Sequence, residues 1–329
     1  MKIAIDAMAG DNGPRVVIDG AIQAAREVGV EVLLVGDQNI LNSELAQHNL
    51  EGVNISIKHA PEVVEMEESP SIAIRKKKRS SIRIATELVK TGEAEAIISA
   101  GNTGAAMATA KILLGALKGV ERPAIATLLP TAKGSALLLD VGANVDCRPR
   151  HLLQFAIMGH IYSKNILGVE NPKIGLLNIG EEESKGNELT KESFKTLKNG
   201  GLNFIGNVEG KDLYAGQVDV VVCDGFTGNV ALKISESVAE MISSHFQREI
   251  RRKFLWKIGY LLMRSCFQDF KKKVDYDEYG GAPLLGINGV FIICHGRSGA
   301  KAIKNAIKVA ASFIQCNVNH HIQSYLSFP

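Results

Sequence analysis

The stretch that decides the fold reads Val218-Asp219-Val220-Val221-Val222-Cys223-Asp224-Gly225-Phe226-Thr227-Gly228-Asn229-Val230. Three consecutive valines predict a strand that is buried on both faces, which is typical of a parallel sheet. The glycines that follow permit a sharp turn and leave room for a ligand. Unpaired N–H groups at the start of the next helix favour anions. The stretch therefore predicts a phosphate-type site at the carboxyl end of a parallel strand.

The same order of strand, Gly-x-Thr-Gly turn and helix occurs earlier, at Ala96-Ile97-Ile98-Ser99-Ala100-Gly101-Asn102-Thr103-Gly104-Ala105. Strands alternate with helices along the rest of the chain. This alternation predicts an α/β fold with a three-layer αβα, doubly wound and mostly parallel sheet. We expect residues 1–329 to form a single domain, from which a helical segment at residues 236–275 protrudes.

Three helical patterns carry further expectations. One helix is expected to open at Ser69-Pro70 and to carry apolar residues as far as Leu88. A second is expected to run on from Val230 to Arg264, before Lys271–Lys273 break the pattern. The last helix is expected to reach Ile314, which leaves His320-His321 at a frayed terminus.

Composition and charge exclude several classes of protein. The 329 residues are 46% hydrophobic and 22% charged, and the net charge of +3 is too mild to indicate a nucleic-acid partner. Aromatic residues make up only 5% and are not interleaved with basic ones, as they would be in a single-strand binder. The basic run Lys76-Lys77-Lys78-Arg79 is interpreted first as a solvated face, with a ligand or partner role as the alternative.

Cysteine usage and hydropathy indicate the compartment. Five widely spaced cysteines without a C-x-x-C pair are typical of a reducing cytosol. The N-terminus begins as a strand and not as a signal peptide, and no apolar run reaches the ~20 residues of a spanning helix. We therefore expect a cytoplasmic protein.

Several common catalytic motifs are missing from the sequence. It contains no G-x-G-x-x-G after the first strand, no G-x-x-x-x-G-K-[ST] and no G-x-S-x-G. No His/Cys pair has zinc spacing. The usual dinucleotide-binding fold, a P-loop NTPase, a serine hydrolase and a zinc site are therefore set aside.

Polar residues gather where the expected strands end, which is where open α/β sheets bind ligands. They are Asp6, Asn12, Asn102, Thr103, Asp140, Asn144, Glu181, Lys185, Asn187, Asn207, Glu209, Asp224, Thr227, Asn229, His295 and Ser298. Any one of them could instead cap a helix. Together, amides, hydroxyls, carboxylates and the cation Lys185 suit a site where bound phosphate is itself the nucleophile, since phosphate needs orientation and charge neutralisation and no protein nucleophile.

The chain resembles the bacterial acyl-(acyl-carrier-protein):phosphate acyltransferases of fatty acid and phospholipid synthesis. Nearly the whole length carries the resemblance, through motifs that occur in this order: Asp6-Ala-Met-Ala-Gly-Asp-Asn-Gly-Pro14, Ser99-Ala-Gly-Asn-Thr-Gly-Ala105, Leu138-Leu-Asp-Val-Gly-Ala-Asn144, Leu177-Asn-Ile-Gly-Glu-Glu182, Lys185-Gly-Asn187, Gly206-Asn-Val-Glu-Gly210, Asp224-Gly-Phe-Thr-Gly-Asn229 and Gly280-Gly-Ala-Pro-Leu-Leu-Gly286. Ala9 departs from the family's usual second glycine, and this smallest of changes is expected to be tolerated.

The resemblance implies a reaction and a set of partners. A long-chain acyl-carrier-protein thioester and orthophosphate would give acyl phosphate, which a membrane glycerol-3-phosphate acyltransferase would use. It also implies a homodimer, no metal or nucleotide, and a fold similar to the isocitrate and isopropylmalate dehydrogenases and the phosphotransacetylases.

Specific site residues are expected from these motifs. We expect Lys185 to neutralise charge on phosphate or on the tetrahedral intermediate, and Asn229 to bind the carbonyl oxygen or the nucleophile. The alternatives are a surface lysine and a first-turn helix residue. Backbone donors are expected from Gly101–Gly104 and Gly225–Gly228. The residues expected to bind phosphate or substrate are Asp6, Asp11, Asn12, Gly101, Asn102, Thr103, Gly104, Asn144, Asn187, Asp224, Gly225, Thr227 and Gly228.

The segment Phe254–Phe270 is apolar almost all round and is flanked by basic residues, so it is expected to lie in a bilayer interface against anionic lipid. The resemblance adds docking to the inner face of the cell membrane and to the acidic carrier protein. The docking residues would be Arg251, Arg252, Lys253, Leu255, Trp256, Ile258, Leu261 and Leu262. A helix buried in the dimer is the alternative.

Three other functions stay open at this point. One is an acyl-coenzyme A phosphotransacylase. The second is a metal- and NAD-dependent decarboxylating dehydrogenase, which would need Asp140, Asp146, Asp219 and Asp224 to meet. The third is a non-catalytic membrane adaptor built on the basic-apolar segment.

Overall fold

The computed structural model describes residues 1–327, with only the backbone of residues 271, 274 and 276. Its strands are β1 (Lys2–Asp6), β2 (Glu31–Gly36), β3 (Ile55–His59), β4 (Ala96–Ser99), β5 (Ala124–Thr131), β6 (Gly134–Leu139), β7 (Ile174–Leu177), β8 (Phe204–Val208), β9 (Val220–Val222), β10 (Ala282–Leu285) and β11 (Val290–Ile293). Its α-helices are α1 (Gly13–Val28), α2 (Gln38–Leu45), α3 (Pro70–Lys76), α4 (Ser81–Thr91), α5 (Thr103–Leu113), α6 (Pro149–Ile166), α7 (Glu188–Lys198), α8 (Gly225–Arg252), α9 (Phe254–Leu262), α10 (Arg264–Val274), α11 (Ala300–Gln315) and α12 (Val318–Ser327).

All the strands named above join one sheet, in the order β3-β2-β1-β4-β11-β10-β5-β6-β9-β7-β8. Seven of the ten neighbouring pairs are parallel, which confirms a mostly parallel α/β sheet. The pairs of β10 with β11, of β10 with β5 and of β5 with β6 are antiparallel. These three reversals make the block from β3 to β11 run opposite to the block from β6 to β8.

Helices cover both faces of the sheet, so the molecule has three layers. One apolar cluster contains Val220 and Val222 of β9 and side chains of α1, α6 and α11. A second cluster, on the other face, contains Val221 and side chains of α4 and α5. The three valines are fully buried, which confirms the prediction of a strand covered on both sides.

The expected single helix after Ser69 is two helices. The chain leaves α3 at Lys77, whose backbone is not helical, and Ser80 pairs with Glu62 before α4 begins. The Lys77 ammonium donates to the Val63 carbonyl at 2.6 Å and contacts Glu68 at 2.6 Å. These contacts to the preceding loop hold the break, which a pattern of apolar residues does not reveal.

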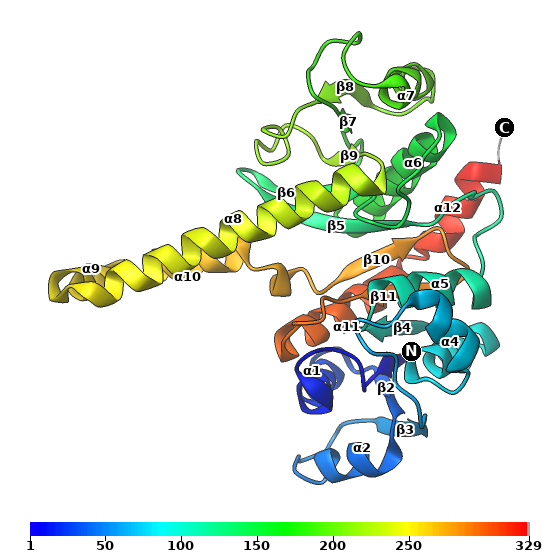
Figure 1. The fold of residues 1–329 in the computed structure, drawn as a ribbon, viewed down its shortest axis with the longest axis vertical. Helices are drawn as coiled ribbons and strands as arrows, with labels where there is room; N and C mark the ends of the chain where they lie inside the picture. Colours follow the sequence, from blue (N-terminus) through cyan, green and yellow to red (C-terminus); the bar gives the residue numbers. More distant parts are fainter. Residues whose placement is uncertain (328–329) are drawn as a thin grey trace.

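The expected protruding segment is present, but it is not one helix. Figure 1 shows α8 leaving the body of the molecule, α9 at its far end and α10 running back. The helix breaks at Lys253, which adopts extended backbone angles, and α10 continues as far as Val274, past the expected stop. Phe246 of α8 and Phe267 of α10 pack edge to face, with 5.8 Å between ring centroids, so the arm is a helical hairpin.

The end of the chain is also better ordered than expected. Residues 318–327 form α12, which contacts α6, and both Val318 and Ile322 are fully buried. The expected frayed terminus at His320-His321 is therefore wrong. Two apolar residues four positions apart on one helix face are enough to dock this segment on the core.

We predict that Ile322→Ala lowers the free energy of unfolding by about 2–5 kcal/mol, since it opens a cavity in a fully buried position. The exposed neighbour His321→Ala should change it by less than about 0.5 kcal/mol. Urea denaturation of the two variants measures the difference. Equal midpoints would show that α12 does not belong to the cooperative core.

Candidate active site

The carboxylate of Asp140 organises the loop at the carboxyl end of β6. Asp140 is fully buried, and its Oδ1 accepts the backbone N–H groups of Ile125 (3.1 Å), Gly142 (3.3 Å) and Ala143 (2.9 Å). Its Oδ2 accepts the backbone N–H and the side-chain amide of Asn144, at 2.7 and 2.9 Å. Burial raises the pKa of Asp140, and these donors oppose the rise. One side chain thus fixes the loop and joins it to the start of β5.

The helix α8 begins directly on this loop. The Gly225 N–H donates to the Asn144 carbonyl at 2.7 Å. A Cβ atom on Gly225 would lie 2.8 Å from the Asn144 backbone, and one on Gly228 would lie 1.9 Å from the Asp140 carbonyl oxygen. Only glycine fits at these two positions, so the glycines serve backbone packing.

The first turn of α8 offers few open donors. Asp224 caps the helix, because its carboxylate accepts the N–H (2.9 Å) and the hydroxyl (2.8 Å) of Thr227. The Gly228 N–H donates to the Asp224 carbonyl at 3.0 Å. With the Gly225 contact, three of the first four N–H groups are engaged. The expected row of backbone donors at Gly225–Gly228 is therefore corrected, and Asp224 and Thr227 act as a cap.

The loop after β7 emerges beside this turn, because β7 and β9 are parallel neighbours. Asn187 caps α7 by accepting the Thr190 N–H at 2.9 Å. Asn207, which is buried at the end of β8, donates to the Glu182 carbonyl at 2.9 Å and holds the loop in place. Lys185 lies on this loop and is exposed.

Two predicted residues keep their functional groups uncommitted. Among residues 1–327, the side chains of Lys185 and Asn229 form no hydrogen bond or ion pair with another described side chain or backbone group. Asn229 lies next to Gly142, where an added Cβ atom would be 3.7 Å from the Asn229 Cγ. An amide at the rim of the Asp140 loop and an ammonium group on the loop after the neighbouring strand β7 are thus available to a ligand.

A second group of predicted residues surrounds the ends of β1, β4 and β11. The buried Asp6 accepts the Ser99 hydroxyl at 2.9 Å, and the Ser99 Oγ accepts the Gly101 N–H at 3.2 Å. Burial raises the pKa of Asp6, while hydroxyl groups of Ser81 and Ser99 oppose the rise. The Gly101 N–H is thus already engaged, and Asp6 supports the turn from below.

Asn102 links α5 to the segment before α3. Its Oδ1 accepts the Ala105 N–H at 2.9 Å, and its Nδ2 donates to the carbonyls of Met66 (2.7 Å) and Glu68 (3.0 Å). All its hydrogen-bonding groups serve this connection. The exposed Thr103 hydroxyl, by contrast, has no partner in the part of the chain that the structure describes.

Asp11 and Asn12 join the first loop to the last one. The Asp11 N–H donates to the Gly296 carbonyl at 2.8 Å, and Asn12 donates to the carbonyls of Arg297 and Ser298 at 3.0 and 3.1 Å. The Asn12 side chain is therefore structural, while the Asp11 carboxylate is exposed.

The two Gly-x-Thr-Gly turns do not share one edge of the sheet. Because β4 and β9 run in opposite directions, Gly101–Gly104 and Gly225–Gly228 leave the sheet at opposite edges. The helix α8 links the two groups, since Lys233 lies one turn beyond Asn229 and its charge acts on His295 at the end of β11. Burial lowers the pKa of His295, and Lys233 adds to the effect.

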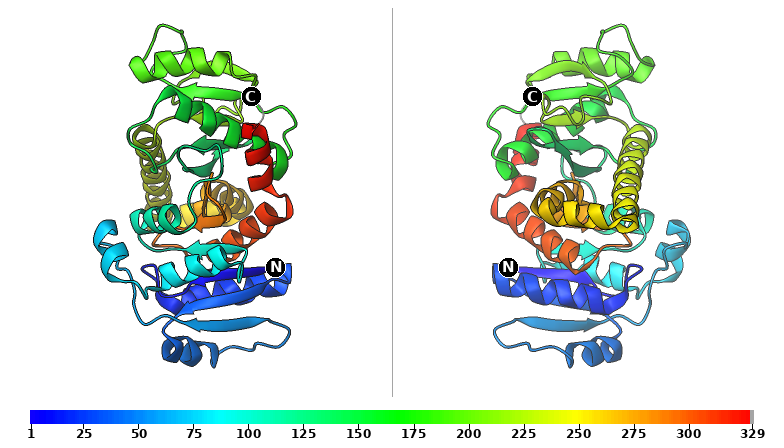
Figure 2. Two further views of the ribbon diagram at one scale, coloured as in Figure 1. Left: turned by 90° about the vertical axis from the view of Figure 1, so that its right-hand side faces the viewer. Right: turned by 90° about the vertical axis from the view of Figure 1, so that its left-hand side faces the viewer.

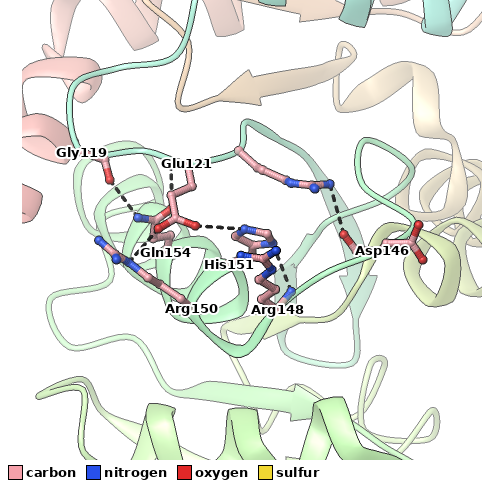
Figure 3. Close-up of polar contacts among 8 residues, drawn as sticks. Gly119, Glu121, Asp146, Arg148, Arg150, His151 and Gln154 are labelled. Carbon is pink, nitrogen blue, oxygen red and sulfur yellow. Dashed lines mark hydrogen bonds and ion pairs between the residues drawn. The ribbon is translucent and has the colours of Figure 1, made fainter.

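Further polar contacts fix the start of α6 near the Asp140 loop (Figure 3). No sequence motif predicted them. His151 accepts the Arg148 N–H at Nδ1, at 3.1 Å, and its Nε2 lies 3.1 Å from Glu121. Glu121 also contacts Arg150 at 2.9 Å. Burial lowers the pKa of His151. Because its Nδ1 accepts a hydrogen bond, the neutral ring carries its proton on Nε2, which faces Glu121. The contacts of Glu121 with His151 and Arg150 are made within this group and support the loop.

The thiol beside the Asp140 loop is not reactive, and the described residues form no metal centre. Burial raises the pKa of Cys147 to about 12, with the charges of Asp140 and Asp224 adding to the effect, so the thiol stays protonated near neutral pH. No group of three or more His, Cys, Asp or Glu side chains within residues 1–327 is placed to hold a metal ion. The aspartates that a metal-dependent dehydrogenase would need are not gathered.

Comparison with solved structures defines the class of fold. The chain is similar to a phosphotransacetylase from Streptococcus pyogenes, with a TM-score of 0.66 and 17% identity over 96% of this chain and 94% of that one. A 4-hydroxythreonine-4-phosphate dehydrogenase from Klebsiella pneumoniae gives a TM-score of 0.52 and 14% identity over 96% and 98% of the two chains. The fold is therefore the α/β fold that phosphotransacetylases share with such dehydrogenases.

Sequence comparison gives the family. The model of the fatty acid synthesis protein family matches residues 1–321, and the chain belongs to this family. A phosphate acyltransferase from Geotalea daltonii is 58% identical over 322 residues, which cover 98% of this chain and 93% of that protein.

We predict that Gly228→Ala destabilises the protein by at least about 1–3 kcal/mol, because the new methyl group collides with the Asp140 carbonyl. Gly210→Ala is the matched control, since nothing lies within 4 Å of its added Cβ atom. Thermal unfolding of both variants tests this. Equal melting temperatures would contradict the close approach of α8 to the Asp140 loop.

Proposed function

We propose that this protein transfers a long-chain acyl group from an acyl-carrier-protein thioester to orthophosphate and so supplies acyl phosphate for phospholipid synthesis. The family match supports acyl transfer to phosphate. The observation that carries the site is the pair of uncommitted side chains on neighbouring loops, with Asn229 at the rim of the Asp140 loop and Lys185 on the loop after β7. The finer likeness of the fold to the isocitrate and isopropylmalate dehydrogenases is part of the same proposal.

The chemistry needs orientation more than a protein nucleophile. A phosphate oxygen attacks the thioester carbonyl carbon, and the carbon–sulfur bond of the tetrahedral intermediate then breaks. The leaving thiolate takes up the proton that hydrogen phosphate gives up. Lys185 neutralises the phosphate charge, and Asn229 donates to the oxyanion as it forms. The reaction requires no metal or nucleotide.

The remaining predicted ligands support this centre in two ways. The loops that present Lys185 and Asn229 are shaped by Asn144, Asn187, Asp224, Gly225, Thr227 and Gly228. The thioester arm reaches the centre over the second group. This group consists of Asp6, Asp11, Asn12, Gly101, Asn102, Thr103 and Gly104. The open N–H groups of Thr103 and Gly104, together with the Thr103 hydroxyl, are the contacts that this second group can offer.

The acyl donor separates the proposal from its nearest alternative. A phosphotransacylase that uses acyl-coenzyme A is the second candidate, which the fold of the phosphotransacetylases favours. Acyl phosphate formation from labelled orthophosphate, measured with each thioester, decides between them. A higher kcat/KM for coenzyme A thioesters would overturn the carrier-protein assignment. No phosphate-dependent turnover at all would leave a non-catalytic adaptor.

We predict that Lys185→Ala and Asn229→Ala each lower kcat for acyl phosphate formation by roughly 100-fold, as the loss of one oxyanion donor does elsewhere. Both side chains are exposed and uncommitted, so the melting temperature should stay unchanged. Lys191→Ala, an exposed lysine on the neighbouring helix, is the matched control and should keep full activity. Near-normal turnover of both variants would refute the assignment.

The arm made by α8, α9 and α10 suits two kinds of contact. Val230, Ile234, Val238 and Met241 form an exposed apolar row along α8, which we assign to the homodimer. At the tip, Leu261 and Leu262 are 67% and 81% exposed, which suits insertion into a bilayer interface beside Arg251, Lys253 and Lys257. Within the described residues, no helix combines enough length and apolar character to cross a membrane.

This arm would place the protein in the cytoplasm at the inner face of the cell membrane, near the glycerol-3-phosphate acyltransferase that consumes its product. The other predicted docking residues at the tip, Leu255, Trp256 and Ile258, are also exposed. Arg252 contacts Glu249 at 3.0 Å, and the Lys253 ammonium lies 4.5 Å from the centroid of the Trp256 ring. These two cations are thus partly satisfied within the arm.

We predict that the double variant Leu261→Glu, Leu262→Glu loses at least about tenfold in affinity for vesicles with anionic lipid, because two exposed apolar side chains that would enter the bilayer interface become charged. Ile40→Glu, an exposed apolar residue on α2, is the control and should sediment like the unchanged protein. Light scattering reports the oligomeric state. Unchanged vesicle binding by a dimeric double variant would speak against the lipid contact.

A further inference from the structure

Four basic residues, Arg75, Lys76, Lys78 and Arg79, form what we call the α3 basic turn. All four are exposed, and among residues 1–327 no acidic oxygen lies within ion-pair distance of them. The residue between them behaves differently, because Lys77 is half-buried and contacts both Glu68 and the Val63 carbonyl. Lys77 therefore anchors the turn, and the other four charges point to solvent.

The α3 basic turn stands next to the second group of site residues. A Cβ atom on Gly104 would lie 2.6 Å from the Pro70 ring at the start of α3. Asn102 donates to the carbonyls of the segment just before it. Figure 2 shows this short light-blue helix at the outer side of the molecule. A partner bound there would be one short helix away from the Asn102–Gly104 turn.

Nearby acidic groups are largely committed to the fold. Glu62 accepts the Arg79 backbone N–H at 2.7 Å, and Glu68 pairs with Lys77. Glu65 and Glu67 are exposed, but they precede α3, whereas Arg75 and Lys76 lie in its last turn and Lys78 and Arg79 follow it. Exposed apolar side chains flank the turn, with Ile72 at 47% and Ile112 at 60% exposure. A basic surface with an apolar border fits an acidic protein.

The apolar seam beneath α3 does not hold an acyl chain in this arrangement. Val64, Ile74, Ile82 and Leu113 line a cavity of only about 10 Å³, scarcely enough for one water molecule. What the region offers is its outer surface.

The tip of the arm is a poorer place for the carrier protein. The helix α8 has 28 residues and is therefore about 42 Å long, so a thioester arm starting at α9 would have to span most of that length. The α3 basic turn lies instead beside the second group of site residues, because Pro70 at the start of α3 packs against Gly104.

We propose that the α3 basic turn is the docking surface for the acidic acyl carrier protein, whose thioester arm passes over the Asn102–Gly104 turn into the site. The arm formed by α8–α10 is then left to the dimer and the lipid surface. This inference rests on the proposed function. Charge complementarity of this kind raises association rates by roughly 10- to 1,000-fold and weakens with salt.

The test is the quadruple variant Arg75→Glu, Lys76→Glu, Lys78→Glu, Arg79→Glu. We expect kcat/KM with acyl carrier protein to fall at least tenfold, and its salt dependence to flatten. With an acyl-pantetheine thioester, which has no protein to dock, kcat/KM should stay within twofold. The melting temperature should also hold, since the four side chains support no contact. A carrier protein with acidic surface residues changed to lysine should recover part of the loss.

The matched control is Arg251→Glu, Lys257→Glu at the tip of the arm, which should leave carrier-protein kinetics unchanged and weaken vesicle binding. The reverse pattern, in which only the tip variant loses carrier-protein activity, would overturn the proposal. So would an equal loss with acyl-pantetheine, since the turn would then act on the site itself. Loss of vesicle binding alone in the α3 variant would assign the turn to lipid and also refute the proposal.

A direct binding measurement separates this inference from the proposed function. Fluorescence anisotropy of labelled carrier protein needs no turnover. If the unchanged protein binds the carrier and the α3 variant does not, the docking surface stands even if no acyl phosphate forms. If the unchanged protein does not bind it, the docking surface is refuted, whatever the reaction proves to be.

Discussion

The buried carboxylate of Asp140 is the contact on which the proposed catalytic edge depends. It accepts five N–H groups, four from its own loop and one from Ile125 near the start of β5. The backbone of that loop then accepts the first N–H of α8. A charge in this position is costly unless every lone pair is satisfied. The donors meet that condition, and in doing so they fix the geometry of Gly225, Gly228 and Asn229. Loop, helix and site residue thus form one rigid unit.

Many of the predicted polar site residues form hydrogen bonds that hold such units together. Asp224, Asn102 and Asn187 cap helices, and Asn12 ties two loops together. Their hydrogen bonds stabilise backbone that no strand or helix would otherwise hold. The groups left over are few, and they are the ones whose chemistry suits a phosphate and a thioester. A rigid frame with a small number of open groups is the arrangement that preorganised catalysis requires.

Much of the fold could be predicted from the sequence, because the signals were local. The run Val220–Val222 was read correctly as a doubly covered strand, and the alternation of strands and helices gave the mostly parallel sheet. The reversal between the two strand blocks could not be predicted, since it depends on β10 and β5, whose pairing partners lie far away in sequence. For the same reason the sequence could not show that the two Gly-x-Thr-Gly turns leave opposite edges of the sheet.

The end of α3 and the docking of α12 could not be predicted from the sequence, because long-range contacts decide both. Lys77 ends α3 by reaching back to Glu68, and α12 forms because Val318 and Ile322 find the core. Neither event has a sequence signature such as proline or glycine at the position concerned. The site was predicted at the level of motifs. Whether an asparagine or aspartate caps a helix or faces a ligand depends on a few ångströms of loop geometry, which residue type alone does not encode.

The order of strands in the sheet also governs how the molecule can be made. The block that begins at residue 2 and the block that ends near residue 222 are joined only by β10 and β5, and β10 and β11 lie at residues 282–293. During synthesis the first half therefore emerges without the two strands that complete it. The sheet closes only when residues 282–293 have left the ribosome, so the facing edges of β4 and β5 stay unpaired until then. The two blocks of the sheet therefore become one unit only near the end of synthesis, and neither is complete without the late strands.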